Sequence, residues 1–384
     1  MMQLPESAYE VTRADWQFLD GALDSGWAIE NFWAHWALFS VGIIGFVLLV
    51  VMGFIWFERR FISPFQLRIG PNRCGPFGLL QPVADAVKVM LKEDIVPTLA
   101  DKWVHFLAPI VVFVPILLIF AVVPIHEGVG LIPDLNVGIL FVIAVGSIET
   151  IAVFMAGYGS NNKYALVGAM RSVAQMVSYE MPMAFAVIAV VIVVGSLSLH
   201  DIVVLQTVPF ALLIPMAFLF YFICALAELQ RTPFDLLEAE SEIIAGYHIE
   251  YSGMKFAMFY LGEYGGAIAQ SAIITTLFLA GWKGPVLPPV LWFMIKLFAV
   301  FAMIVWIRAT WPRVRIDQLM SYAWKYMLPL SLVNLLIVAI EVIWLEGDAI
   351  RWWLVPLNIA ITGGLLTAWA GMFKLAGGGK PVES

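Results

Sequence analysis

Nine apolar segments, each close to the length of a membrane-spanning helix, constrain the fold of this chain more than any other feature. They lie at residues 34–57, 104–123, 138–158, 181–198, 208–227, 264–281, 289–308, 327–345 and 352–373. A bilayer core requires about 20 apolar residues in a helix. Hydrophobic residues make up 62% of the chain, compared with about half in soluble domains. We therefore predict an all-α, polytopic membrane protein.

Most of the positive charge lies in alternate connections between these segments. Fifteen of the 21 lysines and arginines follow the first, third, fifth and seventh segments. Because cytoplasmic loops are rich in these residues, we predict that loops 58–102, 158–180, 228–263 and 308–326 are cytoplasmic and that the N-terminus is outside. The chain then consists of an acidic tail (1–32), one transmembrane domain (33–346) and a C-terminal extension (347–384) with a ninth helix at 352–373.

The sequence offers no redox centre of its own. Cys74 and Cys224 are its only cysteines, too few for an iron–sulfur cluster or a structural zinc site. His35 and His105 open the first two segments, so an up-and-down topology places them at opposite membrane faces, where they cannot share a haem. No glycine-rich nucleotide loop occurs, and the net charge of −7 gives no sign of nucleic acid binding. Any electron carrier then belongs to a partner or a diffusible cofactor.

An amphipathic helix is predicted from Leu79 to Lys92, within the first cytoplasmic connection. Polar residues recur there at spacings of four, three and four, and apolar residues fill much of the remainder. Such a helix lies in the membrane interface. Two interpretations remain open: a surface helix with snorkelling lysines, or one wall of an opening for an amphiphilic ligand.

Two carboxylates mark the middle of the chain. Glu149 lies at the centre of the third segment, and Glu180 lies at the entry to the fourth. A carboxylate in the bilayer core is costly and is most often part of a proton relay. The alternative for Glu149 is a structural hydrogen bond within the bundle.

Six carboxylates crowd the connection between Glu228 and Glu250, where Arg231 is the only lysine or arginine. Pro233 is predicted to occupy a first helical position, which places Asp235, Glu238 and Glu242 on one helix face. Neighbouring carboxylates raise the pKa values of one another, so the group is a candidate proton reservoir. A strip that docks on a basic partner is the alternative, and calcium binding is disfavoured because no EF-hand loop is present.

Several motifs together resemble the quinone-site membrane subunit of respiratory complex I, the proton-pumping NADH:quinone oxidoreductase, in its bacterial form. The motifs are Glu58-Arg59-Arg60, residues 66–73 (QLRIGPNR), residues 81–85 (QPVAD), residues 160–164 (SNNKY), Ser178-Tyr179-Glu180, residues 231–235 (RTPFD), residues 245–251 (AGYHIEY) and Gly262-Glu263-Tyr264. They occur in the family order between about residues 53 and 325, and their combination is highly specific.

The resemblance implies roles for two sets of residues. A quinone chamber would be lined by Glu58, Arg59, Arg68, Asp85, Tyr260, Tyr264, Arg308 and Arg313. A proton path would include Asp235, Glu238, Glu240, Glu242, Glu263, Glu180 and Glu149. The resemblance further implies ubiquinone or menaquinone as substrate, FMN and iron–sulfur clusters in partner subunits, no metal on this chain, and a place in the bacterial inner membrane beside the other complex I subunits.

The sequence departs from the family pattern in two places. Leu237 stands where a proline is frequent, and the family core has eight spans, so the ninth helix is an extension. Three other functions compete: a carboxylate-lined secondary transporter or channel, a subunit of a related membrane-bound hydrogenase, and a structural anchor. No paired broken helices of the transporter type stand out, and an anchor has no need for a buried Glu149.

Overall fold

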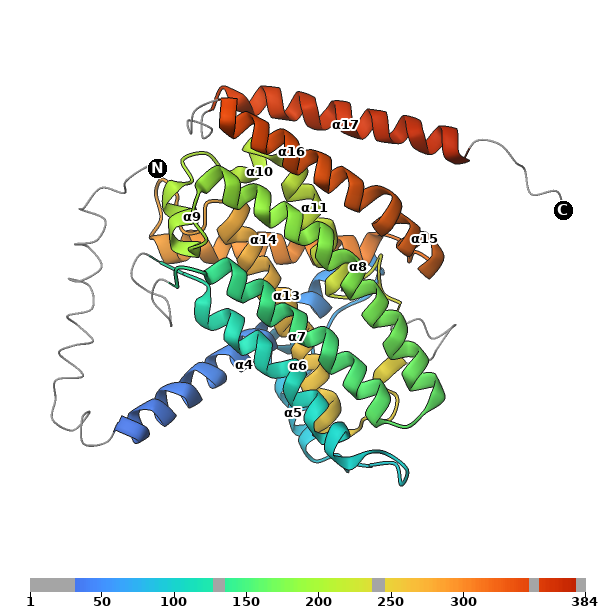
Figure 1. Cartoon of the computed structure of the whole chain (residues 1–384). Coiled ribbons are helices and arrows are strands. Elements are labelled where there is room, and N and C mark those ends of the chain that lie inside the picture. The colour runs from blue at the N-terminus through green and yellow to red at the C-terminus, as the bar shows by residue number, and fades with distance from the viewer. Residues whose placement is uncertain (1–31, 127–134, 237–245, 345–351, 378–384) are drawn as a thin grey trace.

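The computed structural model describes residues 32–126, 135–236, 246–344 and 352–377. The elements of secondary structure in these residues are helices, joined by turns and loops. Figure 1 shows long helices packed side by side, with α17 along the edge of the bundle beside α16. The long helices are α4 (Phe32–Phe65), α6 (Lys102–Val122), α7 (Gly138–Gly159), α8 (Lys163–Val194), α11 (Pro215–Glu228), α13 (Gly253–Phe278), α14 (Pro289–Thr310), α16 (Leu328–Trp344) and α17 (Leu354–Gly377). Shorter helices are α5 (Gln81–Met90), α9 (Leu199–Leu205), α10 (Phe210–Leu213) and α15 (Ile316–Tyr322). The predicted all-α fold is confirmed.

Every predicted apolar segment overlaps at least one of these helices. Among the described residues, five stretches are long and apolar enough to cross a membrane: α6, α7, α8, α14 and residues 316–344. On α14 the side chains of Leu291, Ile295 and Phe298 form one face and are 50%, 48% and 42% exposed. Apolar faces of this kind suit contact with lipid. The structure thus supports a multi-pass membrane protein, while the number of spans and their orientation stay predictions.

Helix α8 begins well before the predicted fourth span. Its N-cap is Asn162, whose Oδ1 accepts a hydrogen bond from the Tyr164 N–H at 2.9 Å, as is common for asparagine at this position. The helix ends at Gly195, where φ is +76°, a conformation that glycine adopts without steric cost. Most of the predicted loop 158–180 is therefore helical.

The fifth apolar segment is broken rather than continuous. Helix α10 ends at Leu213 and α11 begins at Pro215, with Ile214 between them in a non-helical conformation. Proline disfavours helical backbone for the preceding residue and supplies no N–H. The break therefore leaves polar backbone within an otherwise apolar layer, at the opposite end of α11 from Glu228.

The chain turns sharply after α11. The peptide bond between Thr232 and Pro233 is cis, and the N–H of Phe234 donates to the Arg231 carbonyl at 2.8 Å. Pro233 thus lies inside a turn, where a cis-proline at the third position is the type VI arrangement. The prediction that Pro233 begins a helix was wrong, because Pro233 lies in this turn and residues 234–236 are not helical.

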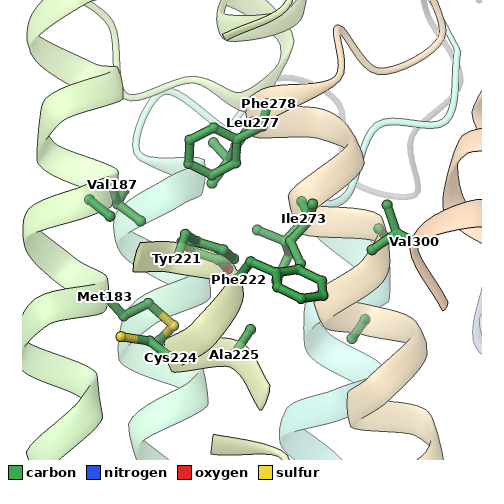
Figure 2. Close-up of a cluster of buried hydrophobic side chains, with 14 of the residues drawn as sticks. Met183, Val187, Tyr221, Phe222, Cys224, Ala225, Ile273, Leu277, Phe278 and Val300 are labelled. Atoms are coloured by element: carbon green, nitrogen blue, oxygen red, sulfur yellow. The ribbon is translucent and has the colours of Figure 1, made fainter. Parts of the chain in front are cut away.

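Helices α8, α11 and α13 share the main hydrophobic core. Figure 2 shows Met183 and Val187 of α8 facing α11, and Phe278 of α13 near Tyr221, with ring centroids 5.5 Å apart. On the other side of α13, Gly262 packs so closely on α6 that a Cβ would lie 2.6 Å from Val112. The glycine therefore permits the close contact that brings α13 next to α6.

Three connections meet at one end of the bundle. The N–H of Asp101 donates to the Gly159 carbonyl at 3.0 Å, and Asn162 Nδ2 donates to Glu250 Oε1 at 2.6 Å. Lys255 forms an ion pair with a connection residue, Asp94, at 2.8 Å. The first, third and fifth connections thus lie together, as alternate connections of an up-and-down bundle must.

Helix α5 confirms the predicted amphipathic helix to within two residues at each end. It packs against α4 and α13, and Asp85 faces Arg59 of α4. Its other face is apolar and open, with Val83, Val87 and Met90 exposed. Both interpretations of this helix remain compatible with such a surface.

Candidate functional site: a buried ion-pair cluster beside a carboxylate-lined cavity

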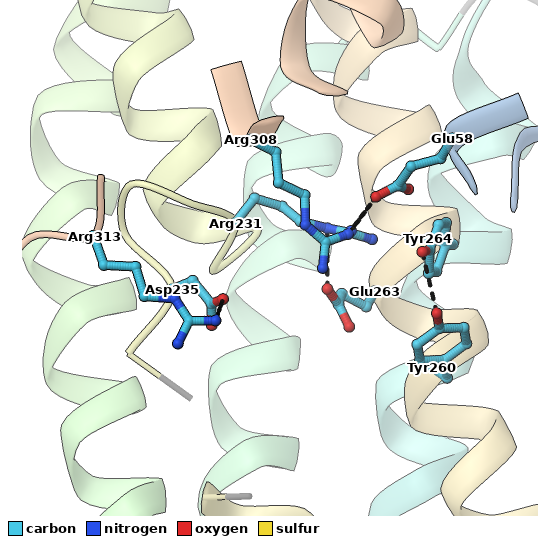
Figure 3. A network of polar contacts seen from close by, with 8 residues as sticks. All are labelled: Glu58, Arg231, Asp235, Tyr260, Glu263, Tyr264, Arg308 and Arg313. Atoms are coloured by element: carbon cyan, nitrogen blue, oxygen red, sulfur yellow. Dashed lines mark hydrogen bonds and ion pairs between the residues drawn. The ribbon is translucent and has the colours of Figure 1, made fainter. Parts of the chain in front are cut away.

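Glu58 lies at the centre of a buried ion-pair cluster (Figure 3). It sits on α4 and is only 2% exposed. Its Oε1 accepts from Arg231 Nη1 at 3.1 Å and also from Arg308 Nη1. Three distant parts of the sequence therefore meet at one carboxylate: α4, the turn after α11, and the end of α14.

Arg231 joins this carboxylate to α13. Its Nε lies 3.0 Å from Glu263 Oε1, and its guanidinium carbon lies 4.3 Å from the centre of the Tyr264 ring. Burial disfavours the charged guanidinium, but Glu263 and Glu58 more than offset this effect, and the pKa of Arg231 is raised well above its ordinary value. Arg231 therefore stays cationic although it is only 3% exposed.

A second row of polar groups runs from α13 towards α5. Tyr260 Oη donates to Tyr264 Oη at 3.1 Å, and Tyr260 is also a polar neighbour of Arg59. Arg59 in turn pairs with Asp85 at 2.5 Å. Since Arg59 and Asp85 are each more than one-third exposed, this row leads from the buried cluster to the surface.

The formal charges of the site balance. Its four guanidinium groups are Arg59, Arg231, Arg308 and Arg313, and its four carboxylates are Asp85, Glu58, Asp235 and Glu263. Buried charges are tolerated when each has a partner, and the loss of one partner is costly. The buried pairs around Glu58 and Arg231 thus depend on one another, and a new charge beside them would redistribute these pairs.

A cavity of about 60 Å³ adjoins the cluster. Four carboxylates line it, Glu149, Glu228, Asp235 and Glu263, together with His248, Tyr260 and apolar side chains. A buried water occupies roughly 15 Å³ by this measure, so the cavity has room for about four waters. Waters between carboxylates can carry protons, and the cavity therefore joins the ion-pair cluster to Glu149 on α7.

Glu228 lines the cavity but was absent from the predicted proton path. Gln270 Nε2 donates to its Oε2 at 2.8 Å, and Tyr221 Oη donates to Gln270 Oε1 at 2.9 Å. A Cβ at Gly146 would lie 3.5 Å from Glu228 Oε1, so the carboxylate rests on α7. The sequence signal that could have found it is a glutamate that ends an apolar segment, three residues before Arg231.

The polar groups continue from the cavity to α8. Ser147, which follows Gly146 on α7, donates a hydrogen bond to Glu180. Ser147 Oγ is also 3.1 Å from the Ile143 carbonyl. The Ser147 hydroxyl thereby links Glu180 to α7, the helix that carries Glu149.

The structure gathers most of the predicted site residues but not all of them. Arg68 lies outside the cluster, exposed on the turn after α4, where its Nε donates to Gln66 Oε1 at 2.8 Å. Asp235 is buried and pairs with Arg313 at 2.9 Å. Glu238, Glu240 and Glu242 fall outside the described residues. Within the described ranges, no group of three or more His, Cys, Asp or Glu side chains is arranged to hold a metal ion.

His248 is a titratable group at the cavity that the sequence did not single out. It lies between aromatic side chains, with its ring centroid 5.2 Å from Tyr247 and 5.5 Å from Phe256. Burial lowers the pKa of His248 to about 4. The imidazole is therefore neutral near pH 7 and can both donate and accept a hydrogen bond at the cavity wall.

The depressed pKa of His248 predicts a pH effect on stability. The unfolded chain binds this proton below about pH 6.5 and the folded chain only below about pH 4, so stability falls as the pH falls. We expect about 2 kcal/mol to be lost between roughly pH 7 and pH 5. The His248→Gln variant of the assembled protein should lack this component in thermal unfolding. Equal losses in the two proteins would contradict the prediction.

The fold and the site define a polytopic helical membrane protein with paired buried charges beside a carboxylate cavity. The profile of the NADH dehydrogenase family matches residues 38–339. The H-type subunit of NADH-quinone oxidoreductase from Dehalococcoides mccartyi strain 195 is 55% identical over 355 residues, which cover 92% of this chain and all of the relative. The H-type subunits from Carboxydothermus hydrogenoformans and Geobacillus kaustophilus are each 48% identical, over 77% and 81% of this chain and 86% and 96% of their own lengths.

The chain therefore belongs to the NADH dehydrogenase family, as a membrane subunit of the bacterial NADH-quinone oxidoreductase type. This finding confirms the resemblance found in the sequence. It also makes the chain one part of a multi-subunit enzyme.

Proposed function

We propose that the chain forms part of a quinone-binding chamber with its entry path, and that it couples quinone reduction to proton translocation through buried carboxylates. The observation that carries this proposal is the contact between the balanced ion-pair cluster and the carboxylate-lined cavity. One site thus combines groups that respond to a charged ligand with groups that can exchange protons.

The chamber would lie along the polar row from Asp85 to Tyr264. A quinone head group is a planar ring with two carbonyl oxygens, and tyrosine hydroxyls and guanidinium groups are suitable donors to these oxygens. Tyr260 and Arg59 supply such donors at the boundary between the exposed and buried parts of the row. Arg68, on its exposed turn, would contact the ligand only if a partner subunit encloses that turn.

The entry path would follow the apolar side of α5. This helix packs on α4 and α13 and leaves Val87 and Met90 exposed, 49% and 67% respectively. A polyisoprenoid tail is apolar and would remain in lipid while the head group moves towards Arg59. The observation supports the second interpretation of the amphipathic helix, as a wall of an opening.

The coupling step would begin with charge. A reduced, anionic quinone beside Arg231 or Arg308 would compete with Glu58 and Glu263 for the guanidinium groups. A carboxylate that loses its cationic partner binds a proton more readily, and cavity waters could deliver one. The change in protonation would then pass to Glu228 and Glu149.

Partner subunits would complete the chamber and supply the electrons, from FMN and iron–sulfur clusters that they hold. Three side chains of the first connection support such contacts, since Leu67, Ile69 and Leu91 are 97%, 87% and 82% exposed. Apolar side chains in a polar connection favour burial by another chain. The orientation with this side in the cytoplasm is part of the proposal.

An Asp85→Asn variant tests the chamber. The replacement removes one charge but keeps the side-chain size, and the exposed Arg59–Asp85 pair contributes at most about 1 kcal/mol to stability. We expect an assembled complex with roughly tenfold slower quinone-dependent NADH oxidation, a loss of about 1.4 kcal/mol in transition-state stabilisation. Lys88→Gln, on the exposed side of the same helix, is the control. Full activity of assembled Asp85→Asn complex would reject this role for Asp85.

Purification distinguishes the proposal from the transporter alternative. The chain should be recovered from membranes with further membrane subunits and iron–sulfur subunits, and proton movement should require quinone turnover. Recovery of the chain alone, with ion transport in the absence of quinone, would support the transporter instead.

A further inference from the structure

A second polar site lies at the broken end of the fifth segment, away from the ion-pair cluster. Helix α11 separates the two sites, with Pro215 at one end and Glu228 at the other, about 20 Å apart at 1.5 Å per residue. The second site is a small pocket of about 10 Å³ between α11, α16 and α17. Its polar lining residues include Asn334 and Glu341 of α16 and Asn358 of α17.

Asn358 links three helices through its side-chain amide. Its Nδ2 donates to the Leu213 carbonyl at 2.7 Å and is 3.3 Å from Glu341 Oε2. The Leu213 carbonyl lies at the end of α10, where backbone carbonyls lack partners within their own helix. Two acceptors on the same atom identify it as the amide nitrogen, so the other amide atom of Asn358 is the oxygen.

The side-chain oxygen of Asn358 lacks a hydrogen-bond donor among the described residues. Asn358 is only 6% exposed, and its Oδ1 is a buried acceptor for which the described residues supply no donor. A buried polar atom without a partner costs roughly 1–3 kcal/mol, so an acceptor in this position calls for a proton donor. Asn358 lines the pocket, so a group in the pocket can supply this donor.

Glu341 is a carboxyl group whose negative charge would be poorly compensated. It is three residues from Trp344, the last residue of α16, which is 87% exposed and typical of the membrane interface. Among the described residues that line the pocket, Glu341 is the only titratable or charged group. An ionised carboxylate at the edge of the bilayer, with one long hydrogen bond and no cation among the described residues that line its pocket, is poorly compensated.

We propose that Glu341 is a proton-binding site whose protonated carboxyl pairs reciprocally with the Asn358 amide and thereby fastens α17 to the core. Asn358 Nδ2–H donates to Glu341 Oε2, and the carboxyl O–H donates to Asn358 Oδ1, directly or through one water in the pocket. A single proton on Glu341 neutralises the carboxylate and also supplies a hydrogen-bond donor to Asn358 Oδ1. The pocket has room for about one water, which matches the bridged form.

The pair also connects the C-terminal helix to the break in the fifth segment. Loss of the proton would remove the donor to Oδ1 and place a negative charge beside the amide oxygen. Both effects weaken the attachment of α17 at Asn358, while the hydrogen bond to Leu213 remains. The proton on Glu341 therefore controls how firmly α17 is held.

Infrared spectroscopy of the assembled complex near neutral pH tests the protonation directly. The difference between the natural chain and Glu341→Gln should contain one lost carbonyl band of a protonated carboxylic acid. The control is Asp201→Asn, which removes a carboxylate that accepts from Ser196 Oγ at 2.7 Å and does not line the pocket. If Glu341→Gln removes only bands of ionised carboxylates, the proposal is overturned. The same holds if those bands respond to exchange of sodium for potassium, which would make Glu341 a cation-binding carboxylate.

Cysteine labelling tests the attachment of α17. Thr362 also lines the pocket, and a Thr362→Cys variant in a Cys74→Ser background reports access to the α16–α17 contact through its reaction with a soluble maleimide. Glu341→Gln can mimic the protonated acid, because its amide both donates and accepts, so labelling should stay slow. Glu341→Ala should accelerate labelling roughly tenfold, the ratio given by about 1.4 kcal/mol. Equal labelling of the two variants would overturn the proposal.

Discussion

Replacement of Arg231 by methionine should destabilise the protein by about 3–5 kcal/mol, because it removes one partner from a buried ion-pair set. Glu58 and Glu263 would lose the guanidinium group that holds them, although Arg308 would still contact Glu58. Methionine is similar in length and fills the space beside Tyr264, so the loss reflects charge more than packing. The measurement is the amount of assembled complex in membranes and its thermal unfolding midpoint.

Two further variants make this result interpretable. Arg315→Met removes an exposed partner of Asp317, since the two side chains are 75% and 63% exposed, and it should change stability by less than about 0.5 kcal/mol. Addition of Glu263→Gln to the Arg231→Met variant should restore part of the lost stability, because it removes one of the two carboxylates that Arg231 holds, whereas Glu58 keeps its contact with Arg308. Equal thermal unfolding midpoints for Arg231→Met and Arg315→Met would show that the ion pairs around Arg231 do not stabilise the protein by about 3–5 kcal/mol.

Replacement of Glu228 by glutamine should reduce proton pumping at least tenfold while the complex still assembles, a ratio that corresponds to about 1.4 kcal/mol. The glutamine oxygen can still accept from Gln270, so the hydrogen bond at 2.8 Å has a counterpart. The amide cannot bind and release a proton, however, and the cavity would lose one of its four carboxylates. Pumping should be measured in vesicles together with quinone-dependent NADH oxidation.

Glu250→Gln is the matched control for this experiment. Glu250 belongs to the same connection and also accepts from a side-chain amide, that of Asn162 at 2.6 Å, but it does not line the cavity. It should keep normal pumping. Normal pumping in both variants would remove Glu228 from the proposed path, whereas loss in both would point to a general need for acidic residues in this connection.

The sequence predicted several features because their signals are local. The apolar segments anticipated the long helices, and the polar spacing from Gln81 to Lys92 anticipated α5. The sequence failed at α10 and α11, where Pro215 breaks an apolar segment of unchanged composition, and at Pro233, which lies in a turn. Proline restricts the backbone at both positions, but whether a helix restarts after it depends on tertiary contacts.

The candidate site was predictable as a set of residues but not as an arrangement. Glu263, Asp235 and Arg59 were selected from motifs, yet nothing in their spacing shows that Arg231 joins Glu58 to Glu263. Glu228 was counted among the clustered carboxylates but not placed on the proton path, because its position beside Gly146 depends on how the end of α11 lies against α7. Arg68 was selected with the others, although the turn after α4 places it outside the cluster.

The sequence by itself determined that this is a helical membrane protein with few charges, and its ordered motifs determined the family. Hydropathy over 20 residues and short motifs are properties of continuous chain, so they require no folded structure. The tertiary structure alone decided which charges are paired, which carboxylates share the cavity, and that Asn358 reaches Glu341 and Leu213. These are contacts between distant parts of the chain, and a buried charge or amide acquires its partner only when helices pack.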